Sequence, residues 1–260
     1  IALGFTLIYK ASEVVNFAQG EVMMVGAYVN FFFVSYFSSM VGEVNGWVFL
    51  LAFLGSIIFA VIFGITLDFI INRPLKDEPV FSIIMATISL GIILRALTAL
   101  IAGPISLVPQ SPFGGSVMEV GGVVVSYLDL SIIFSAVVLM GLFFVFFNKT
   151  RWGIAMKATS EDSEAAQLMG IPVKKVYMIV WVFAAIVGVV SGILLAPRMS
   201  LLDTSMGFLG LKAFPAAILG GFGSIPGAVV GGIILGVIET VSMGTLSFHF
   251  SWIKEINDII

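Results

Sequence analysis

Residues 149–175 read KTRWGIAMKATSEDSEAAQLMGIPVKK, a polar interruption between two long apolar runs. This stretch contains five basic and three acidic side chains, whereas the runs on either side are almost wholly apolar. A charged side chain is costly inside the hydrocarbon core of a bilayer. The interruption therefore lies outside the membrane and separates the spans before it from those after it.

The interruption contains the sequence signals of a short helix over residues 159–169. Thr159 or Ser160 can cap its start, and Thr159 with Asp162 has the spacing of a capping box. Gly170 can adopt the left-handed conformation that ends a helix. About ten residues at ~1.5 Å each cover ~15 Å, half of a bilayer core, so we expect this helix to lie beside the membrane.

One face of this predicted helix is apolar. Ala165, Leu168 and Met169 fall on that face, and a stripe of this size suits the groove of a partner protein. An ordinary solvated helix in a loop would have the same pattern. Both interpretations remain open at this point.

The composition indicates an all-α polytopic membrane protein. Hydrophobic residues make up 60% of the chain, charged residues 10%, and the mean hydropathy is +1.16. A soluble domain carries about 25% charged residues. The net charge of −3 is small and argues against nucleic-acid binding.

The basic residues orient the predicted spans. We expect spans at residues 21–40, 47–71, 80–102, 128–147 and 176–196, six or more crossings in all, with residues 1–9 as the tail of an earlier span. Loops 72–79 and 148–175 contain seven Lys and Arg residues, whereas loops 41–46 and 103–126 contain none. The positive-inside rule places the two basic loops, and with them the helix at 159–169, in the cytoplasm.

We expect residues 1–260 to form a single transmembrane domain that is truncated at both ends, with residues 149–175 as a cytoplasmic loop within it. Residues 1–9 are too short to span, and residues 256–260 stop where another apolar run could begin. Residues 123–127 could form one strand of a small hairpin.

Polar residues also lie next to the predicted spans. Asn16, Gln19 and Glu21 form a break between two apolar runs, which is either an ordinary turn or an unwound part of a discontinuous helix that lines a pathway. Asn16 could cap the second span. Arg95 lies within a span, and we expect it to extend toward the nearer membrane surface rather than to pair with a buried partner.

The last third of the chain predicts two helical pieces, 208–219 and 228–241, that meet at a glycine turn. Gly223, Gly227 and Gly231 recur at four-residue intervals, which indicates close helix packing or a role in a pathway. Lys212 should be paired or extended to the surface, and His249 should lie at the membrane interface. Gly188 and Gly192 form another small-residue packing motif.

Several kinds of chemistry are absent from the sequence. No phosphate-binding Gly-x-x-x-x-Gly-Lys-Ser/Thr motif occurs, so the chain has no nucleotide-binding loop of this type. One His and no Cys leave no basis for a His-rich or thiolate metal site. We expect no catalytic residues and no metal ligands.

Three blocks of sequence resemble the permease subunits of branched-chain amino acid ABC importers. The blocks are GFTLIY (4–9) with VNFAQGEVMMVGAY (15–28), RWGIAMKA (151–158) with EAAQLMGI (164–171), and GLKAFPAAILGGFGSIPGAVVGG (210–232). They extend over nearly the whole chain in the order of that family. The second block is similar to the cytoplasmic loop through which these permeases contact their ATPase.

The resemblance implies a multi-span permease in the cytoplasmic membrane of a bacterium or archaeon, with discontinuous helices and a cytoplasmic coupling helix. Its expected partners are two ATP-binding subunits, a second homologous permease, an extracytoplasmic substrate-binding protein and membrane lipid. ATP and Mg would be used by the ATP-binding subunits, and this chain would bind no cofactor. The residues expected to couple it to the ATPase are Glu164, Ala165, Ala166, Leu168, Met169 and Gly170.

Two alternatives remain beside this interpretation. Sibling permeases carry urea or short amides, and the residues quoted above do not identify the substrate. A self-contained secondary transporter or channel would also place broken helices near polar residues. Co-purification of an ATPase would distinguish an importer permease from a secondary transporter.

Overall fold

The computed structural model describes residues 1–12, 14–75, 78–103, 105–109, 116–120, 123–199 and 201–249. Helices dominate these residues, and η1 is π-helical whereas η2 is a 3₁₀-helix. The elements are α1 (Ala2–Ser12), α2 (Gln19–Val41), α3 (Gly46–Leu67), η1 (Asp68–Asn72), α4 (Arg73–Leu75), α5 (Val80–Ala102), β1 (Val117–Val120), β2 (Val123–Ser126), α6 (Tyr127–Lys149), α7 (Arg151–Glu161), α8 (Ser163–Leu168), α9 (Val173–Met199), η2 (Thr204–Phe208), α10 (Leu209–Gly220) and α11 (Ile225–His249).

Five helical segments of the described chain are long and apolar enough to cross a membrane. They are α2, α3 with its continuation to Leu75, α5, α6 and α9. Shorter apolar stretches follow at Thr204–Gly220 and Pro226–Ser242. The prediction of an all-α polytopic membrane protein is confirmed.

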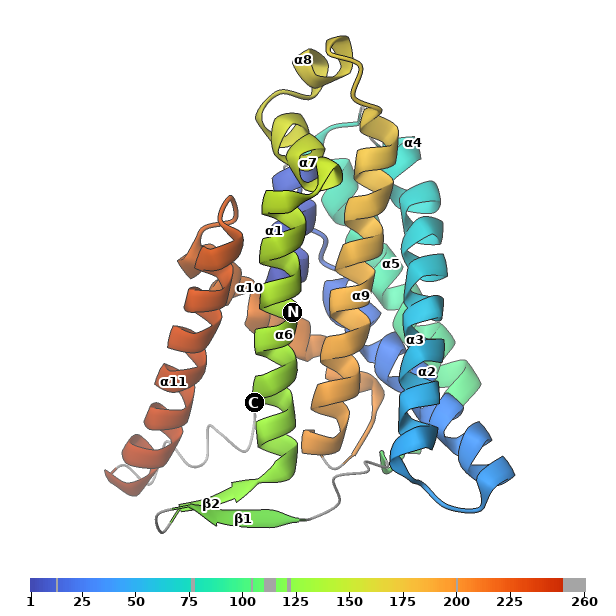
Figure 1. Cartoon of the computed structure of the whole chain (residues 1–260), viewed down its shortest axis with the longest axis vertical. Coiled ribbons are helices and arrows are strands. Elements are labelled where there is room, and N and C mark those ends of the chain that lie inside the picture. The colour runs from blue at the N-terminus through green and yellow to red at the C-terminus, as the bar shows by residue number, and fades with distance from the viewer. Residues whose placement is uncertain are drawn as a thin grey trace.

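The two ends of the molecule differ as the distribution of basic residues predicts. Figure 1 shows α4, α7 and α8 at one end and the β1–β2 hairpin at the opposite end. The two loops rich in Lys and Arg therefore lie at the same end of the molecule. The positive-inside rule identifies this end as the cytoplasmic one. In the hairpin, β1 and β2 pair antiparallel with Val117 opposite Ser126, as the extended pattern of 123–127 predicts.

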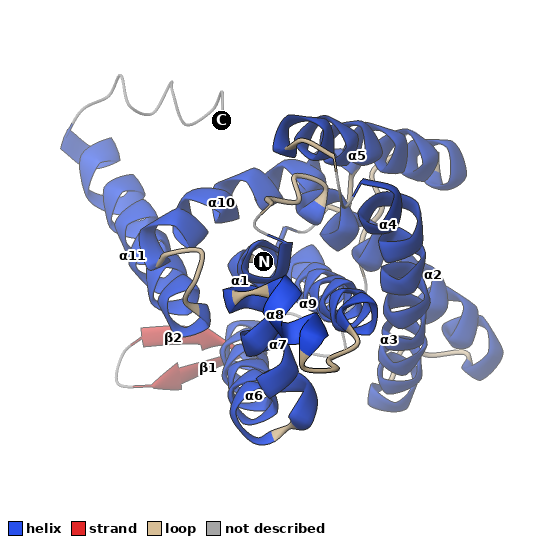
Figure 2. Ribbon diagram, turned by 90° about the horizontal axis from the view of Figure 1, so that it is seen from above, coloured by secondary structure: helices blue, strands red, loops and turns tan. Residues whose placement is uncertain are grey.

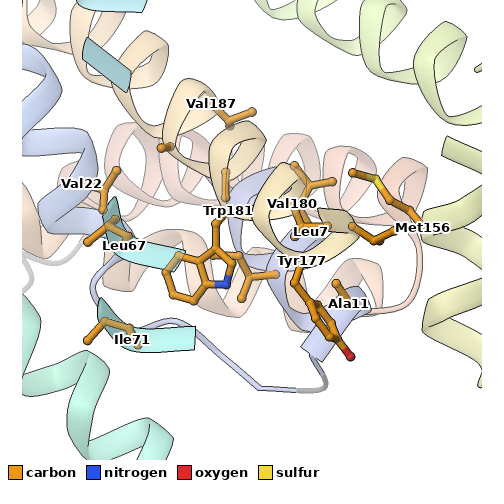
Figure 3. Close-up of a cluster of buried hydrophobic side chains, with 14 of the residues drawn as sticks. Leu7, Ala11, Val22, Leu67, Ile71, Met156, Tyr177, Val180, Trp181 and Val187 are labelled. Atoms are coloured by element: carbon orange, nitrogen blue, oxygen red, sulfur yellow. The ribbon is translucent and has the colours of Figure 1, made fainter. Parts of the chain in front are cut away.

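The core is built around α9, which packs against α1, α2 and α3. Seen from above, α1 and α9 lie in the middle of the molecule (Figure 2). Tyr177 and Trp181 project from α9 into a buried cluster with Leu7, Leu67 and Val180 (Figure 3). Because lipid tails are as apolar as these side chains, close packing is the main stabilising contribution inside a membrane.

Small residues allow α2 and α9 to approach closely. A Cβ atom on Gly192 would overlap the carbonyl oxygen of Met23, and one on Gly26 would lie 2.5 Å from the Cα of Val189. The predicted packing motif of Gly188 and Gly192 lies at this crossing. Neither helix could hold its present position with a larger residue there.

The predicted single helix at residues 159–169 is wrong. Residues 151–168 form two helices, α7 and α8, because the backbone at Asp162 is extended, with φ −156° and ψ 107°. The Asp162 carboxylate accepts hydrogen bonds of 2.9 Å from the N–H groups of Glu164 and Ala165. Asp162 is therefore the cap of α8. The expected capping box does not form, because Thr159 is buried inside α7.

The glycine-rich C-terminal third forms the antiparallel pair α10 and α11. α10 closely matches the predicted piece, whereas α11 runs from Ile225 to His249 and is longer than predicted. Lys212 of α10 forms an ion pair with Glu239 of α11 at 3.3 Å. Of the two alternatives expected for Lys212, pairing or extension to the surface, the structure shows pairing. The side chain of His249 lies outside the described part of the structure.

Candidate functional site

The cytoplasmic helix α8 turns part of its surface outward. Leu168 is 88% exposed and Met169 is 84% exposed, and Ala165 is exposed beside them. Glu164 is also exposed. Leu168 and Met169 are large apolar side chains at a polar end of the molecule, outside the apolar spans. The predicted apolar stripe therefore lies where a partner protein can reach it.

Ala166 differs from the other residues predicted for this contact. It is 5% exposed and belongs to the core cluster that includes Val173 and Val176 of α9. Ala166, which the sequence predicted at the contact with a partner, faces the opposite side of α8 and attaches the helix to its own chain. Gly170 has φ +84°, the left-handed conformation predicted for it.

The polar break before α2 is buried inside the bundle. Residues 14–18 are irregular, and Asn16 and Gln19 are each 1% exposed. Asn16 Oδ1 accepts from the Ala18 N–H at 3.0 Å, so the expected cap on α2 does not form. The Gln19 amide donates to the Ala184 carbonyl of α9 at 3.0 Å. The break is therefore an internal feature of the fold and not a surface turn.

Two polar atoms in this break have no hydrogen-bond partner among the described residues. They are Nδ2 of Asn16 and Oε1 of Gln19. A buried polar group without a partner costs about 1–3 kcal/mol. The two atoms are therefore unsatisfied polar groups in the interior of the helical bundle.

Glu21, the third residue of the predicted pathway set, forms an ion pair with Arg95 of α5. The expectation that Arg95 extends to the membrane surface is therefore wrong. Its guanidinium carbon instead lies 3.8 Å from the centre of the Phe208 ring. A charge in a span is costly when alone, and pairing with an opposite charge reduces that cost. The sequence placed Glu21 and Arg95 in apolar spans but did not identify them as partners, since Asp68 and Asp129 also lie within predicted spans.

A cavity of about 330 Å³ at the cytoplasmic end connects the break with α8. The break contributes Asn16, α5 contributes Thr87, and α8 contributes Glu164 and Gln167 to its wall. Trp181 of α9 also lines it. A movement of α8 would therefore change the space next to Asn16. Nothing in the sequence alone indicated this proximity.

The three glycines predicted for packing in the C-terminal third have different surroundings. A Cβ atom on Gly227 would overlap the Gly220 carbonyl oxygen, and one on Gly231 would overlap that of Ala216. Both residues thus lie where α11 contacts α10. Gly223 is exposed, and a Cβ atom there would meet nothing within 4 Å. The predicted packing role is wrong for Gly223, because it lies in the open turn between the helices.

Replacing Gly231 by leucine is expected to lower the amount of folded permease several-fold. The leucine side chain would force α11 away from α10, and overpacking of this kind costs about 1–3 kcal/mol. Gly223→Leu is the matched control, because it adds the same side chain in open space. Fluorescence-detected size-exclusion of both variants measures the effect. Equal peaks for the two variants would show that the α10–α11 contact does not support the fold.

No group of three or more His, Cys, Asp or Glu side chains that could hold a metal ion occurs in the described part of the chain. The features that remain are a bundle of apolar spans, a buried polar break and an exposed apolar helix at the cytoplasmic end. Together they define a multi-pass membrane protein with the architecture of a transport component.

Comparisons with known proteins identify the family to which this transport component belongs. Residues 1–260 match the family model described as "Branched-chain amino acid transport system / permease component". The chain is 32% identical over 256 residues to the high-affinity branched-chain amino acid transport system permease protein LivH of Escherichia coli K12, covering 96% of this chain and 83% of that protein. It is 34% identical over 246 residues to the corresponding protein BraD of Pseudomonas aeruginosa, covering 92% and 80%.

An archaeal relative is more distant. The probable branched-chain amino acid transport permease protein LivH of Methanocaldococcus jannaschii is 28% identical over 250 residues, covering 93% of this chain and 75% of that protein. No solved structure matches the chain.

The chain belongs to the family of permease components of branched-chain amino acid transport systems. It is a multi-pass inner-membrane protein and a transport subunit, not an enzyme. As a component of a transport system, it works with partner subunits.

Proposed function

We propose that this chain is the permease subunit of an ATP-driven importer for branched-chain amino acids. The match of all 260 residues to the family of permease components supports this proposal most strongly. The relatives named above are branched-chain amino acid permeases, which favours that substrate class over urea or short amides. The same names do not favour a self-contained secondary transporter.

The proposed partners are two ATP-binding subunits, a second related permease and an extracytoplasmic substrate-binding protein. The ATP-binding subunits would supply the nucleotide site, since the sequence has no phosphate-binding loop of the Gly-x-x-x-x-Gly-Lys-Ser/Thr type. This chain would then contribute half of a pathway between two permeases.

α8 would transmit the movement of the ATP-binding subunit. Leu168 and Met169 offer an apolar contact, and Ala166 holds the same helix against α9. When the ATP-binding subunits close, a push on α8 would reach the cavity that Glu164 and Gln167 share with Asn16. The polar break would thereby open or close toward the cytoplasm.

Co-purification and uptake test this proposal together. Affinity-tagged permease from its own host membranes is expected to bring down an ATP-binding protein with a phosphate-binding loop and a second permease, both identified by mass spectrometry. In proteoliposomes the ATP-binding subunits would face the lumen. The complex should accumulate radiolabelled leucine in the lumen only when ATP is inside and the binding protein is outside. Accumulation by the purified chain alone, driven by an ion gradient, would contradict the proposal.

A further inference from the structure

We propose that Glu21 and Arg95 bind the two charges of a zwitterionic amino acid, while Phe17 and Phe214 contact its apolar side chain. This inference rests on the proposed function and assigns the residues that read the substrate within the membrane. Four observations support it: the placement of residues 17–21 between α5 and α10, the unpaired Nε of Arg95, the exposure of Arg95 and Phe208, and the charge and aromatic content of this region.

Residues 17–21 lie against one face of α5. Thr87, Gly91 and Arg95 follow one another at four-residue intervals and so share a face of that helix. The Thr87 hydroxyl accepts from the Phe17 N–H at 3.3 Å. One turn further along, a Cβ atom on Gly91 would lie 3.2 Å from Oε2 of Glu21. Arg95 then binds Oε1 of the same carboxylate.

The opposite side of residues 17–21 is covered by η2 and α10. A Cβ atom on Gly207 would lie 3.1 Å from Oε1 of Glu21, and Gly210 packs directly against Gly20. Phe214, one turn beyond Gly210, contacts Phe17 with ring centroids 5.4 Å apart. The Glu21 carboxylate is thus flanked by glycines on both sides, and an aromatic pair lies one turn away.

The ion pair leaves binding capacity unused. Arg95 donates to Glu21 through Nη2, and its Nε is buried and has no hydrogen-bond partner in the described part of the chain. A guanidinium has five N–H donors in a planar arrangement that matches a carboxylate. Gly91 lets the backbone of α5 lie directly against this carboxylate, since a Cβ atom there would be 3.2 Å from Glu21 Oε2. A zwitterionic ligand can exchange with this pair, its carboxylate binding Arg95 while its ammonium takes the place of the guanidinium beside Glu21.

The Arg95 half of the pair is accessible from the surface of this chain, whereas Glu21 is buried. The Arg95 side chain is 29% exposed, and Phe208, whose ring lies under the guanidinium, is 53% exposed. An arginine exposed to lipid within a span is strongly unfavourable. This side of the bundle must therefore face water or another polypeptide, as the wall of a pathway between two permeases would.

The chemistry of this region selects a zwitterion with an apolar side chain. A ligand with one charge would replace one half of the internal pair and leave the other residue unpaired within the membrane, which is costly. A zwitterion offers a partner to both. Phe17 and Phe214 are each partly buried and offer an aromatic surface to an aliphatic group.

The test uses the complete transport complex and the double variant Glu21→Gln with Arg95→Gln. Both charges are removed together, so neither is left unpaired within the membrane. If the pair only stabilised the fold, the variant complex should retain its uptake of leucine. We expect leucine uptake per complex, at saturating binding protein, to fall at least tenfold. Lys212→Gln with Glu239→Gln is the matched control, since it removes the ion pair between α10 and α11, and it should retain uptake.

A second measurement needs no variant. In the wild-type complex without binding protein, millimolar leucine is expected to raise the melting temperature, whereas isopentylamine and 4-methylpentanoate, which each lack one charge of leucine, should not. An equal response to all three probes, or to none of them, would overturn the proposed site, as would normal uptake by the Glu21 and Arg95 double variant. Failure of the wild-type complex to import any branched-chain amino acid would instead contradict the proposed function itself.

Discussion

Replacing Gly192 by leucine is expected to reduce the folded permease in the membrane at least tenfold. A Cβ atom at this position would already overlap the carbonyl oxygen of Met23 in α2, and that backbone atom cannot move without shifting the helix. Overpacking costs about 1–3 kcal/mol where side chains can adjust, and more against backbone. Domains are stable by only about 5–15 kcal/mol, so the loss is a large fraction of the total.

Gly141→Leu is the matched control for this prediction. Gly141 lies in the middle of α6, another apolar span, and a Cβ atom there would meet nothing within 4 Å. The two substitutions therefore differ only in what the new side chain encounters. Detergent extraction followed by size-exclusion chromatography gives the amount of folded protein. Recovery of both variants at the wild-type level would show that the α2–α9 crossing tolerates separation.

Replacing Leu168 and Met169 together by aspartate is expected to lower leucine uptake at least tenfold while the amount of permease stays unchanged. Both side chains are almost fully exposed, so neither contributes to packing within the chain. In the proposed complex they would enter an apolar contact with the ATP-binding subunit. Burying charges there without a partner would weaken the contact. Reconstituted vesicles allow uptake and ATP hydrolysis to be measured on the same sample.

Two further variants separate this effect from loss of structure. Ala166→Asp would bury a charge against α9, so we expect it to lower the yield and melting temperature of the permease itself. Glu161→Gln, at the exposed end of α7, should leave uptake unchanged. Full coupling in the Leu168 and Met169 variant would remove α8 from the mechanism, and the interpretation of a simple solvated helix would then hold.

The sequence by itself determined the membrane class, the main spans and their orientation. These properties depend on local composition, because an apolar run of about 20 residues and the charges beside it report directly on the bilayer. The hairpin strand at 123–126 and the left-handed Gly170 were predictable for the same reason, since a short pattern or one backbone conformation decides each of them. The family blocks added the expectation of a permease.

Helix boundaries within the polar interruption were less certain from sequence. Thr159, Ser160 and Asp162 can all cap a helix, and local propensity ranks them closely. The burial of Thr159 within α7 left Asp162 as the residue free to accept the N–H groups of α8. Packing thus selected one of three caps that the local sequence allowed.

Only the tertiary structure decided which distant side chains meet. Glu21 and Arg95 are 74 positions apart, and their pairing depends on how α2 and α5 are rotated about their axes. The same holds for Ala166, which faces α9 while Leu168, two positions further along, faces outward. Helix rotation and tilt result from the packing of many side chains and glycines across the whole bundle. No short stretch of sequence contains that information, because each contact joins residues whose positions are set by every helix between them.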